Sequence, residues 1–236
     1  MLAAVSAVLA IVPFVPWGNF LLSSVSSSGA YKRQKAVLDL NTTSNNNANG
    51  AVAGEQVNVN DLTSFPPNGS WLITYPSSGD LTLDSQNPDT FQKFALIRLP
   101  SELGGSNKSA ASFVAFSKVC VHLWCSPNYD PQKSTNSTFE TYQCPCHGSI
   151  YQLPVKDPQN PSNLVDGGKA IEGPASLQAP PTNAIPMLTL TSDANGDLNI
   201  EPPVWDVDHN GVLGYGRNYQ SYQNYILPVA EGQQKP

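Results

Sequence analysis

The sequence predicts an all-β protein built from antiparallel sheets. Short runs rich in β-branched and aromatic residues recur along the chain, and turn-forming residues separate them. The chain contains 21 prolines, many of them between these runs, which argues against long helices because proline lacks a backbone N–H donor. Residues 193–196 include an Asn-Gly pair between two such runs, a pattern typical of a β-hairpin.

The predicted strands follow one another with the composition of half-buried or buried β-structure. The first alternates apolar and polar residues, and the later ones are aromatic or branched runs. We expect strands at residues 56–59, 71–75, 91–99, 112–119, 187–191 and 197–201. Residues 157–168 and the C-terminal tail show no clear period. A length of 236 residues is enough for one large β domain or two small ones with a sizeable core.

The N-terminal segment predicts a membrane anchor followed by a tether. Residues 2–22 contain no charged residue, and about 20 apolar residues span a bilayer core. A cleaved signal peptide is the alternative, but no Lys or Arg precedes the apolar run as its n-region requires. We therefore expect a membrane anchor at residues 1–22 and a flexible linker, rich in Ser, Asn and Gly, at residues 23–54.

The surface composition points to a location outside the cell. Charged residues make up 13% of the chain, against about 25% in a typical soluble domain. Neutral polar residues replace them, which suits either an acidic medium or an external protein. A net charge of −6 with 12 Lys and Arg argues against nucleic-acid binding. Four Asn-x-Ser/Thr sequons also favour a globular head on the extracellular face: Asn41, Asn68, Asn107 and Asn136.

The residues that can carry chemistry lie in two short segments. The first reads Cys-Val-His-Leu-Trp-Cys from Cys120, and the second reads Cys-Pro-Cys-His-Gly-Ser-Ile-Tyr from Cys144. Together they hold all four cysteines and two of the three histidines. Two thiolates and two imidazoles suit either a tetrahedral zinc ion or a mixed-ligand [2Fe–2S] cluster, and both leave two cysteines for a disulfide. Spacing alone does not separate zinc from iron–sulfur.

The two segments resemble the cluster-binding loops of Rieske proteins. The second segment matches the Cys-Pro-Cys-His-Gly-Ser form of that family from Cys144 onward. The resemblance implies a disulfide between Cys125 and Cys146 that ties the loops together. The ligands that it implies for a [2Fe–2S] cluster are Cys120 and Cys144 on the inner iron and His122 and His147 on the outer iron.

The same resemblance assigns roles to residues around the cluster. The hydroxyls of Ser149 and Tyr151 would donate hydrogen bonds to cluster sulfurs and raise the reduction potential. Gly173 and Pro174 open a segment similar to the proline loop that covers the cluster in this family. Residues 126–143, between the two motifs, are expected to form an exposed insertion.

One residue departs from the family pattern. Trp124 stands where the first loop of Rieske proteins usually has glycine. Glycine permits a backbone conformation that is unfavourable for tryptophan. Either the first loop is shaped differently in this chain, or Trp124 shields the cluster face.

Within the Rieske family, the low charge and Asn-rich surface are similar to those of the respiratory SoxF-type proteins of thermoacidophilic archaea. This similarity implies a Rieske fold with a base domain and an inserted cluster-binding subdomain, preceded by the membrane anchor. We expect the Rieske domain at residues 55–205, its cluster-binding part at about 117–180, and a C-terminal extension at residues 206–236.

The resemblance implies a subunit of a respiratory quinol-oxidising complex of the cytochrome bc type, not catalytic alone. It would take an electron and a proton from a membrane quinol through His147 and His122, with His147 the closer contact. Its partners would be a cytochrome b-like subunit and a haem or copper acceptor. A Rieske subunit of an arsenite-oxidase-like or oxygenase system is one alternative, and a structural zinc module is another. The disulfide-forming pair argues against an oxygenase, whose Rieske domains generally lack it.

Overall fold

The computed structural model describes the central part of the chain. It covers residues 32–42, 50–87, 92–131, 141–165, 167–179 and 183–201. The predicted membrane anchor at residues 1–22 and the predicted C-terminal extension at residues 206–236 lie outside these ranges, as does the sequon at Asn136. Among the described residues, no helix has the length and apolar character needed to cross a membrane.

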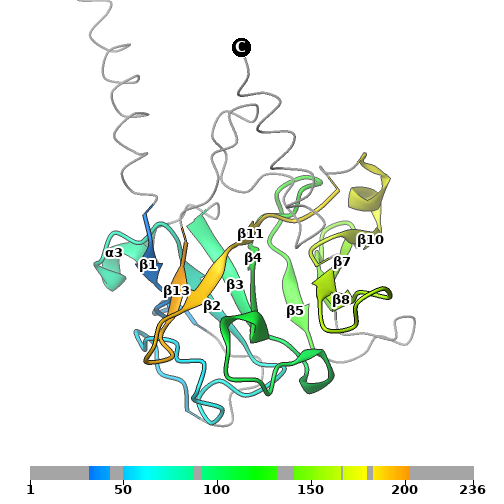
Figure 1. The fold of residues 1–236 in the computed structure, drawn as a ribbon. Helices are drawn as coiled ribbons and strands as arrows, with labels where there is room; N and C mark the ends of the chain where they lie inside the picture. The colour runs from blue at the N-terminus through cyan, green and yellow to red at the C-terminus, as the bar shows by residue number, and fades with distance from the viewer. Residues whose placement is uncertain are drawn as a thin grey trace, which may run out of the picture. The chain divides into compact units, whose positions relative to one another are not determined.

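The base of the molecule begins with a four-stranded antiparallel sheet in the order β11-β4-β3-β2 (Figure 1). Every residue of its central strand β3 is buried, as is every residue of β4. Trp71 pairs with Leu96, and Leu96 pairs with Ala115, so branched and aromatic residues meet across the sheet. The strands are β2 (Ser70–Thr74), β3 (Lys93–Arg98), β4 (Phe113–Ser117) and β11 (Met187–Leu188).

A three-stranded sheet in the order β1-β13-β12 completes the base. Strands β12 (Leu190–Ser192) and β13 (Leu198–Ile200) form the hairpin that the Asn-Gly pair predicted. Strand β1 (Gln34–Lys35) lies within the segment predicted to be a flexible linker. Ala36 and Leu38 follow it and are fully buried. This part of the chain therefore belongs to the packed base, because alternate apolar side chains between the Ser- and Asn-rich stretches enter the core.

A second group of strands is inserted in the sequence between β4 and β11. It forms a four-stranded antiparallel sheet, β10-β7-β6-β5, and a hairpin of β8 and β9. Figure 1 shows these strands beside the base. The elements are β5 (Asn128–Asp130), β6 (Thr141–Gln143), β7 (Ile150–Gln152), β8 (Val155–Lys156), β9 (Leu164–Val165) and β10 (Ala170–Glu172).

The prediction of an exposed insertion at residues 126–143 is wrong at both of its ends. Tyr129 on β5 and Tyr142 on β6 pair directly across the sheet, and Tyr142 pairs with Tyr151 on β7. All three tyrosines are buried. Strands β5 and β6 have only three residues each, which is too short to show the alternation of a strand, and prolines and polar residues surround them.

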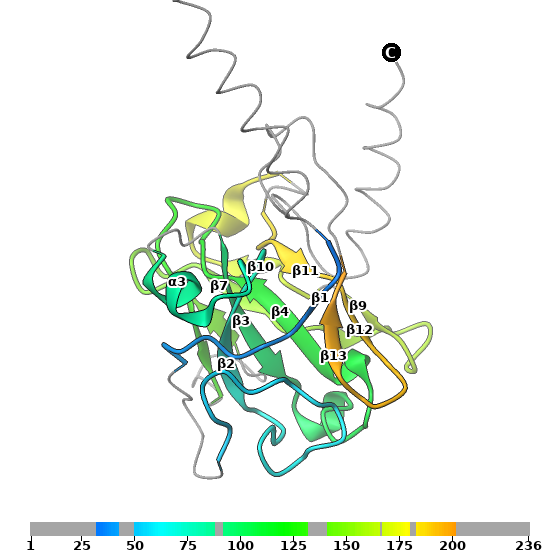
Figure 2. The same cartoon turned by 90° about the vertical axis from the view of Figure 1, so that its left-hand side faces the viewer.

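The base and the inserted strands share one hydrophobic core. Ile97 and Phe116 of the base pack in the same cluster as Tyr142 and Tyr151 of the insertion, and the rings of Phe116 and Tyr142 lie 5.3 Å apart. The described helices are short: α3 (Leu81–Gln86), η2 (Ser101–Leu103), η3 (Ala110–Ser112) and η4 (Pro174–Leu177). Figure 2 shows α3 and β1 facing the viewer on the base. The predicted class, antiparallel β with a base and an inserted subdomain, is confirmed.

Candidate metal centre

The first cysteine–histidine loop connects β4 to β5. The Cys120 N–H donates to the Cys125 carbonyl oxygen at 2.8 Å, and the Trp124 N–H donates back to the Cys120 carbonyl oxygen at 2.9 Å. Trp124 has a φ of 61°, in the left-handed region. The loop therefore keeps the conformation that glycine favours, although tryptophan occupies the position. Of the two explanations for Trp124, a differently shaped loop is wrong.

The second loop connects β6 to β7 and repeats the same pattern of hydrogen bonds. The Cys144 N–H donates to the Ser149 carbonyl oxygen at 2.8 Å, and the Gly148 N–H donates to the Cys144 carbonyl oxygen at 3.1 Å. Gly148 has a φ of 73° and stands at the same loop position as Trp124. The two loops are thus structural twins, each presenting its first cysteine from the same kind of turn.

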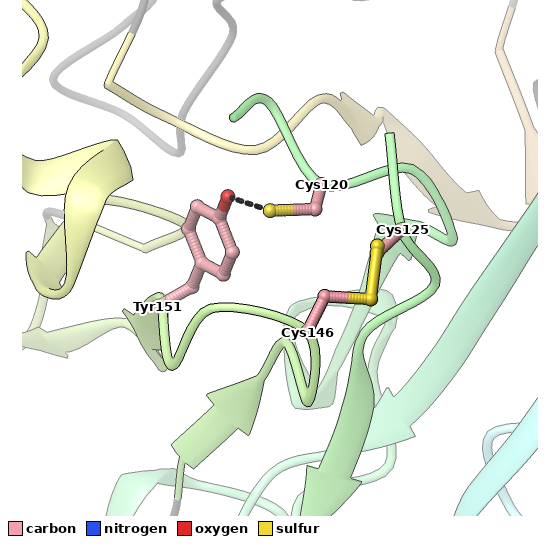
Figure 3. The surroundings of a disulfide bond; sticks show 4 residues. All are labelled: Cys120, Cys125, Cys146 and Tyr151. Atoms are coloured by element: carbon pink, nitrogen blue, oxygen red, sulfur yellow. Dashed lines mark hydrogen bonds between the residues drawn. A yellow bond between two sulfur atoms is a disulfide. The ribbon is translucent and has the colours of Figure 1, made fainter. Parts of the chain in front are cut away.

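A disulfide joins the twin loops. Cys125 and Cys146 are bonded with their Cα atoms 6.4 Å apart, which is the pairing that the resemblance implied (Figure 3). Cys120 and Cys144 are buried free thiols. The sulfurs of Cys125, Cys144 and Cys146 lie within 4.8 Å of one another, but two of them belong to the disulfide. The thiols left to bind a metal are therefore those of Cys120 and Cys144.

The two histidines of the loops meet edge to face. The ring centroids of His122 and His147 are 4.8 Å apart, and the ring planes are perpendicular. The Nδ1 atom of His122 is buried and has no hydrogen-bond partner among the described residues. A buried ring nitrogen without a partner is unfavourable unless it binds an ion. His147 is exposed. His122 Nδ1 therefore has the surroundings of a metal ligand.

Tyr151 holds the free thiol of the first loop. Its hydroxyl oxygen lies 3.0 Å from the Cys120 sulfur (Figure 3). The same oxygen accepts a hydrogen bond from the Val121 N–H at 3.2 Å. Because the oxygen already accepts from Val121, its own proton is available for the sulfur. Burial raises the pKa of Tyr151, and the neighbouring Cys120 raises it further. The phenol thus stays protonated and can donate to a thiolate.

Ser149 contacts the predicted proline loop, and its hydrogen bond to a cluster sulfur stays a prediction. It is fully buried, and its hydroxyl oxygen accepts a hydrogen bond from the Ala175 N–H at 3.2 Å. Gly173 has a φ of 73°, and a Cβ atom there would lie 2.5 Å from the Gly148 carbonyl oxygen. Pro174 then begins η4. The predicted proline loop therefore lies against the second loop, and Ser149 attaches it there.

Gln178 is a site residue that no pattern in the sequence indicates. Its Nε2 donates to the Val121 carbonyl oxygen at 3.2 Å and ties the end of η4 to the first loop. Its buried Oε1 has no hydrogen-bond partner in the described part of the chain. The loops and the η4 segment thus enclose buried polar atoms that the surrounding residues leave unpaired.

The surroundings of Cys144 show what a thiolate needs at this place. Burial raises the pKa of the Cys144 thiol, while the backbone N–H groups of Cys146 and His147 lower it. The net effect is an increase, so a thiolate here needs a cation beside it in addition to the amides. Two buried thiols and two facing imidazoles fit a mixed-ligand [2Fe–2S] cluster, and this donor set alone also fits zinc.

Comparisons with known proteins give similarity at the level of structure. No family model matches the chain, and no curated protein is significantly similar to it. The soluble domain of Rieske protein II (SoxF) from Sulfolobus acidocaldarius is similar with a TM-score of 0.40 and 18% identity, covering 72% of this chain and 77% of that one. NdmB from Pseudomonas putida CBB5 gives a TM-score of 0.33 and 12% identity over 74% of this chain and 35% of that one. At these scores the similarity carries no functional argument, and the proposals below rest on the side chains.

Proposed function

We propose that this chain is a Rieske-type one-electron carrier that takes an electron and a proton from a membrane quinol and passes the electron to a cytochrome or oxidase partner. The observation that carries the proposal is the pair of twin loops. They carry two buried free thiols and two histidines whose rings face each other, and they are tied by the Cys125–Cys146 disulfide. The match of these loops to the Rieske motifs favours iron–sulfur over zinc.

The residues that would hold the cofactor are Cys120, Cys144, His122 and His147. A [2Fe–2S] cluster with these ligands supplies a one-electron acceptor with a potential of roughly −150 to +300 mV, since neutral imidazoles replace two anionic thiolates. Tyr151 favours the electron-rich state by donating its hydroxyl proton toward the Cys120 sulfur. This hydrogen bond favours the high-potential part of that range.

The exposed imidazole of His147 would receive the proton. A neutral imidazole nitrogen accepts a hydrogen bond from a donor hydroxyl. His147 is exposed, whereas His122 is half-buried, which favours His147 as the closer contact with a quinol. The apolar segment at residues 1–22 supports a membrane-anchored head, and the sequons favour the outer face. The partners of a quinol-oxidising subunit would be a cytochrome b-like subunit and a haem or copper acceptor.

A Rieske subunit of another redox enzyme, such as an arsenite-oxidase-like or oxygenase system, is the second candidate. The same ligands would serve it. The disulfide between the loops favours the quinol-oxidising role. The Rieske domains of oxygenases have similar cluster-binding loops but generally lack this disulfide. Placing the head on the outer face agrees with the disulfide as well, since such bonds persist outside the reducing cytosol.

The test is the electron paramagnetic resonance spectrum of purified protein after mild reduction with ascorbate. A rhombic signal, with an average g value below that of all-thiolate clusters, is expected. A signal that appears only with dithionite would mean a low-potential centre and would exclude quinol oxidation. No signal under either condition, together with zinc in the intact protein, would replace the proposal by a structural zinc module.

A further inference from the structure

The twin loops differ at the one position where their backbone is left-handed. Gly148 occupies this position in the second loop with φ 73°, and Trp124 occupies it in the first loop with φ 61°. Glycine adopts this conformation without steric conflict, whereas a side chain bearing a Cβ is strained there. Residues held in such strained conformations concentrate at functional sites.

Trp124 is an exposed aromatic residue on this strained backbone. The Trp124 side chain is 67% exposed, so most of the indole faces solvent. The first loop is held by its two backbone hydrogen bonds and by the disulfide at Cys125, which impose the left-handed conformation on Trp124. The strain is thus enforced by the loop, and the indole is displayed on the surface.

Trp124 lies in an apolar neighbourhood next to a predicted metal ligand. It stands two residues after His122 in the same loop, and Leu123 between them is 63% exposed. Gln178 ties the end of η4 to Val121 in that loop, which brings Leu177, 86% exposed, to the same end of the molecule. Consecutive exposed apolar side chains, such as Leu123 and Trp124, indicate contact with an apolar ligand or partner.

We propose that Trp124 is a substrate-contact residue whose indole packs against the ring of the quinol that reaches the histidines. The inference rests on the proposed function and names a residue that sets donor specificity. An indole offers a flat apolar face, and aromatic rings favour offset or edge-to-face packing with it. A hydrophobic aromatic donor gains from this contact, whereas a small hydrophilic reductant does not.

The first experiment measures the rate of reduction of the holoprotein by two donors, a decyl-substituted benzoquinol and ascorbate. In Trp124→Gly the apparent dissociation constant for the quinol is expected to rise about 3- to 10-fold, as the loss of one aromatic contact predicts. The rate at saturating quinol, the rate with ascorbate and the reduction potential are expected to stay unchanged. Trp124→Phe keeps a ring and should retain most of the affinity.

Leu83→Ala serves as the matched control. Leu83 lies on α3 in the base and is 60% exposed, so it is an exposed apolar residue outside the loops. Its replacement should change none of these rates. A second measurement tests the strain: Trp124→Gly should raise the melting temperature by about 2–4 °C. Gly148→Ala should lower the melting temperature, because alanine is strained in the left-handed conformation of this position. The added Cβ has no atom within 4 Å, so the change reports backbone strain and not a steric clash.

Three results would overturn the assignment of Trp124. An unchanged quinol affinity in Trp124→Gly would show that the indole does not contact the quinol. A shifted reduction potential would show instead that Trp124 shields the metal centre. Weaker binding of Trp124→Gly to phosphatidylcholine vesicles without quinol would place the indole on lipid. Failure of the proposed function is distinct, because the wild-type protein itself would then not be reduced by the quinol.

Discussion

The base and the site end of the molecule satisfy their buried polar groups in opposite ways. In the base, Lys93 is buried and its ammonium group donates to three oxygens: Asp39 Oδ2 at 2.7 Å, Thr74 Oγ1 at 2.9 Å and the Asp84 carbonyl at 2.5 Å. The Asp39 carboxylate accepts from Lys93, from Thr74 and from the Asn41 N–H. Every charge in this group therefore has partners within the chain.

Arg98 repeats this arrangement on the adjoining part of the base. Its guanidinium is fully buried, lies 4.7 Å from the centre of the Phe113 ring, and donates to backbone carbonyls of two different loops. The acceptors are the carbonyl oxygens of Val59, Asp61, Phe65, Gly105 and Asn107. One side chain thus donates hydrogen bonds to the carbonyl oxygens of both loops, so these oxygens need no partner from outside the chain.

The site end, formed by residues 120–125, 144–149 and 173–178, leaves its buried polar atoms unpaired. Among the described residues, His122 Nδ1 and Gln178 Oε1 have no hydrogen-bond partner, and in the base only Trp71 Nε1 is in that position. The thiols of Cys120 and Cys144 are buried as well. The base therefore pairs its buried charges within the chain, whereas the site end leaves buried polar atoms that a bound metal would pair.

Breaking the ion pair of the base should produce the largest loss of stability. In Lys93→Met the buried Asp39 carboxylate loses its cation, and breaking a buried pair in this way costs about 3–5 kcal/mol. Chemical denaturation at neutral pH measures the free energy of unfolding. The metal content of the folded fraction should not change, because the site end is separate from this pair.

The control is the double variant Asp39→Asn with Lys93→Met. It removes both charges and keeps an oxygen that can accept from the Asn41 N–H, while the new amide NH2 can donate to the Thr74 hydroxyl oxygen. Most of the lost stability should return, since an uncharged pair has no desolvated ion. A double variant as unstable as Lys93→Met would show that lost packing, and not the buried charge, caused the effect.

Removing the disulfide should affect the other end by a somewhat smaller amount. The bond closes a loop with a sequence separation of 21 residues, for which loop-closure entropy predicts a contribution of about 3 kcal/mol. In Cys125→Ala with Cys146→Ala, the twin loops lose the bond that holds them together. We expect faster release of the metal to a chelator and faster amide exchange at residues 120–125 and 144–149.

The base provides the internal reference for that experiment. Amide exchange of β3 should remain slow in the disulfide variant, because β3 is buried between β2 and β4. An equal increase of exchange in β3 and in the loops would contradict the distinction between the two ends. The molecule would then unfold as one unit whose stability is set at the site.

Tyr151→Phe should change electronic properties more than stability. The variant loses the hydroxyl that lies 3.0 Å from the Cys120 sulfur. A hydrogen bond to a charged group contributes about 1.5–3 kcal/mol, and 59 mV corresponds to a tenfold change in a one-electron equilibrium, so we expect the potential to fall by about 60–130 mV. Redox titration followed by electron paramagnetic resonance measures the shift.

Tyr142→Phe is the matched control for Tyr151. Tyr142 is equally buried and pairs with Tyr151, but its hydroxyl donates to the Ser117 carbonyl oxygen at 3.0 Å. The potential should stay constant in this variant while stability falls by about 1 kcal/mol. A similar fall in potential for both variants would mean that general loosening of the inserted sheet, and not the contact with Cys120, sets the potential.

The sequence predicted the parts of the molecule that leave a local signature. The strands predicted at residues 71–75 and 112–119 are present as β2 and β4, because their continuous apolar runs face buried neighbours. The site loops were recognisable because cysteine and histidine at short spacing have few other uses. In both cases the information lies within a few consecutive residues.

The remainder depends on contacts between distant residues, which leave no local pattern. Residues 56–59 alternate like a strand but form only isolated bridges, at Gln56 with Val37 and at Asn58 with Asp197. Gln178 and Ser149 have their roles only because η4 lies against both loops. The twin geometry was equally hidden, since Trp124 and Gly148 are dissimilar residues that share a backbone conformation.

The smallest expected effect is a dependence of the base on acid. Burial raises the pKa of Asp39, but hydrogen bonds from Lys93, Thr74, the Asn41 N–H and Ser85 lower it more, so the net value lies below the ordinary 3.8. A carboxyl with a lowered pKa stabilises the folded state above its unfolded value, and this contribution disappears as the pH falls through the folded value. The relevant window therefore lies at and below pH 3.8.

The measurement compares the denaturation midpoints of the wild type and of the Asp39→Asn, Lys93→Met double variant. The pH runs from about 2 to about 6, the range where carboxyls titrate. The wild type should lose more stability than the double variant as the pH falls below 3.8. Both proteins contain the other acids, such as Asp61, so the difference between them isolates the Asp39 carboxyl. Parallel curves would mean that the effect of burial on the pKa of Asp39 cancels the effect of its hydrogen bonds. Ionisation of Asp39 would then make no pH-dependent contribution to the stability of the base.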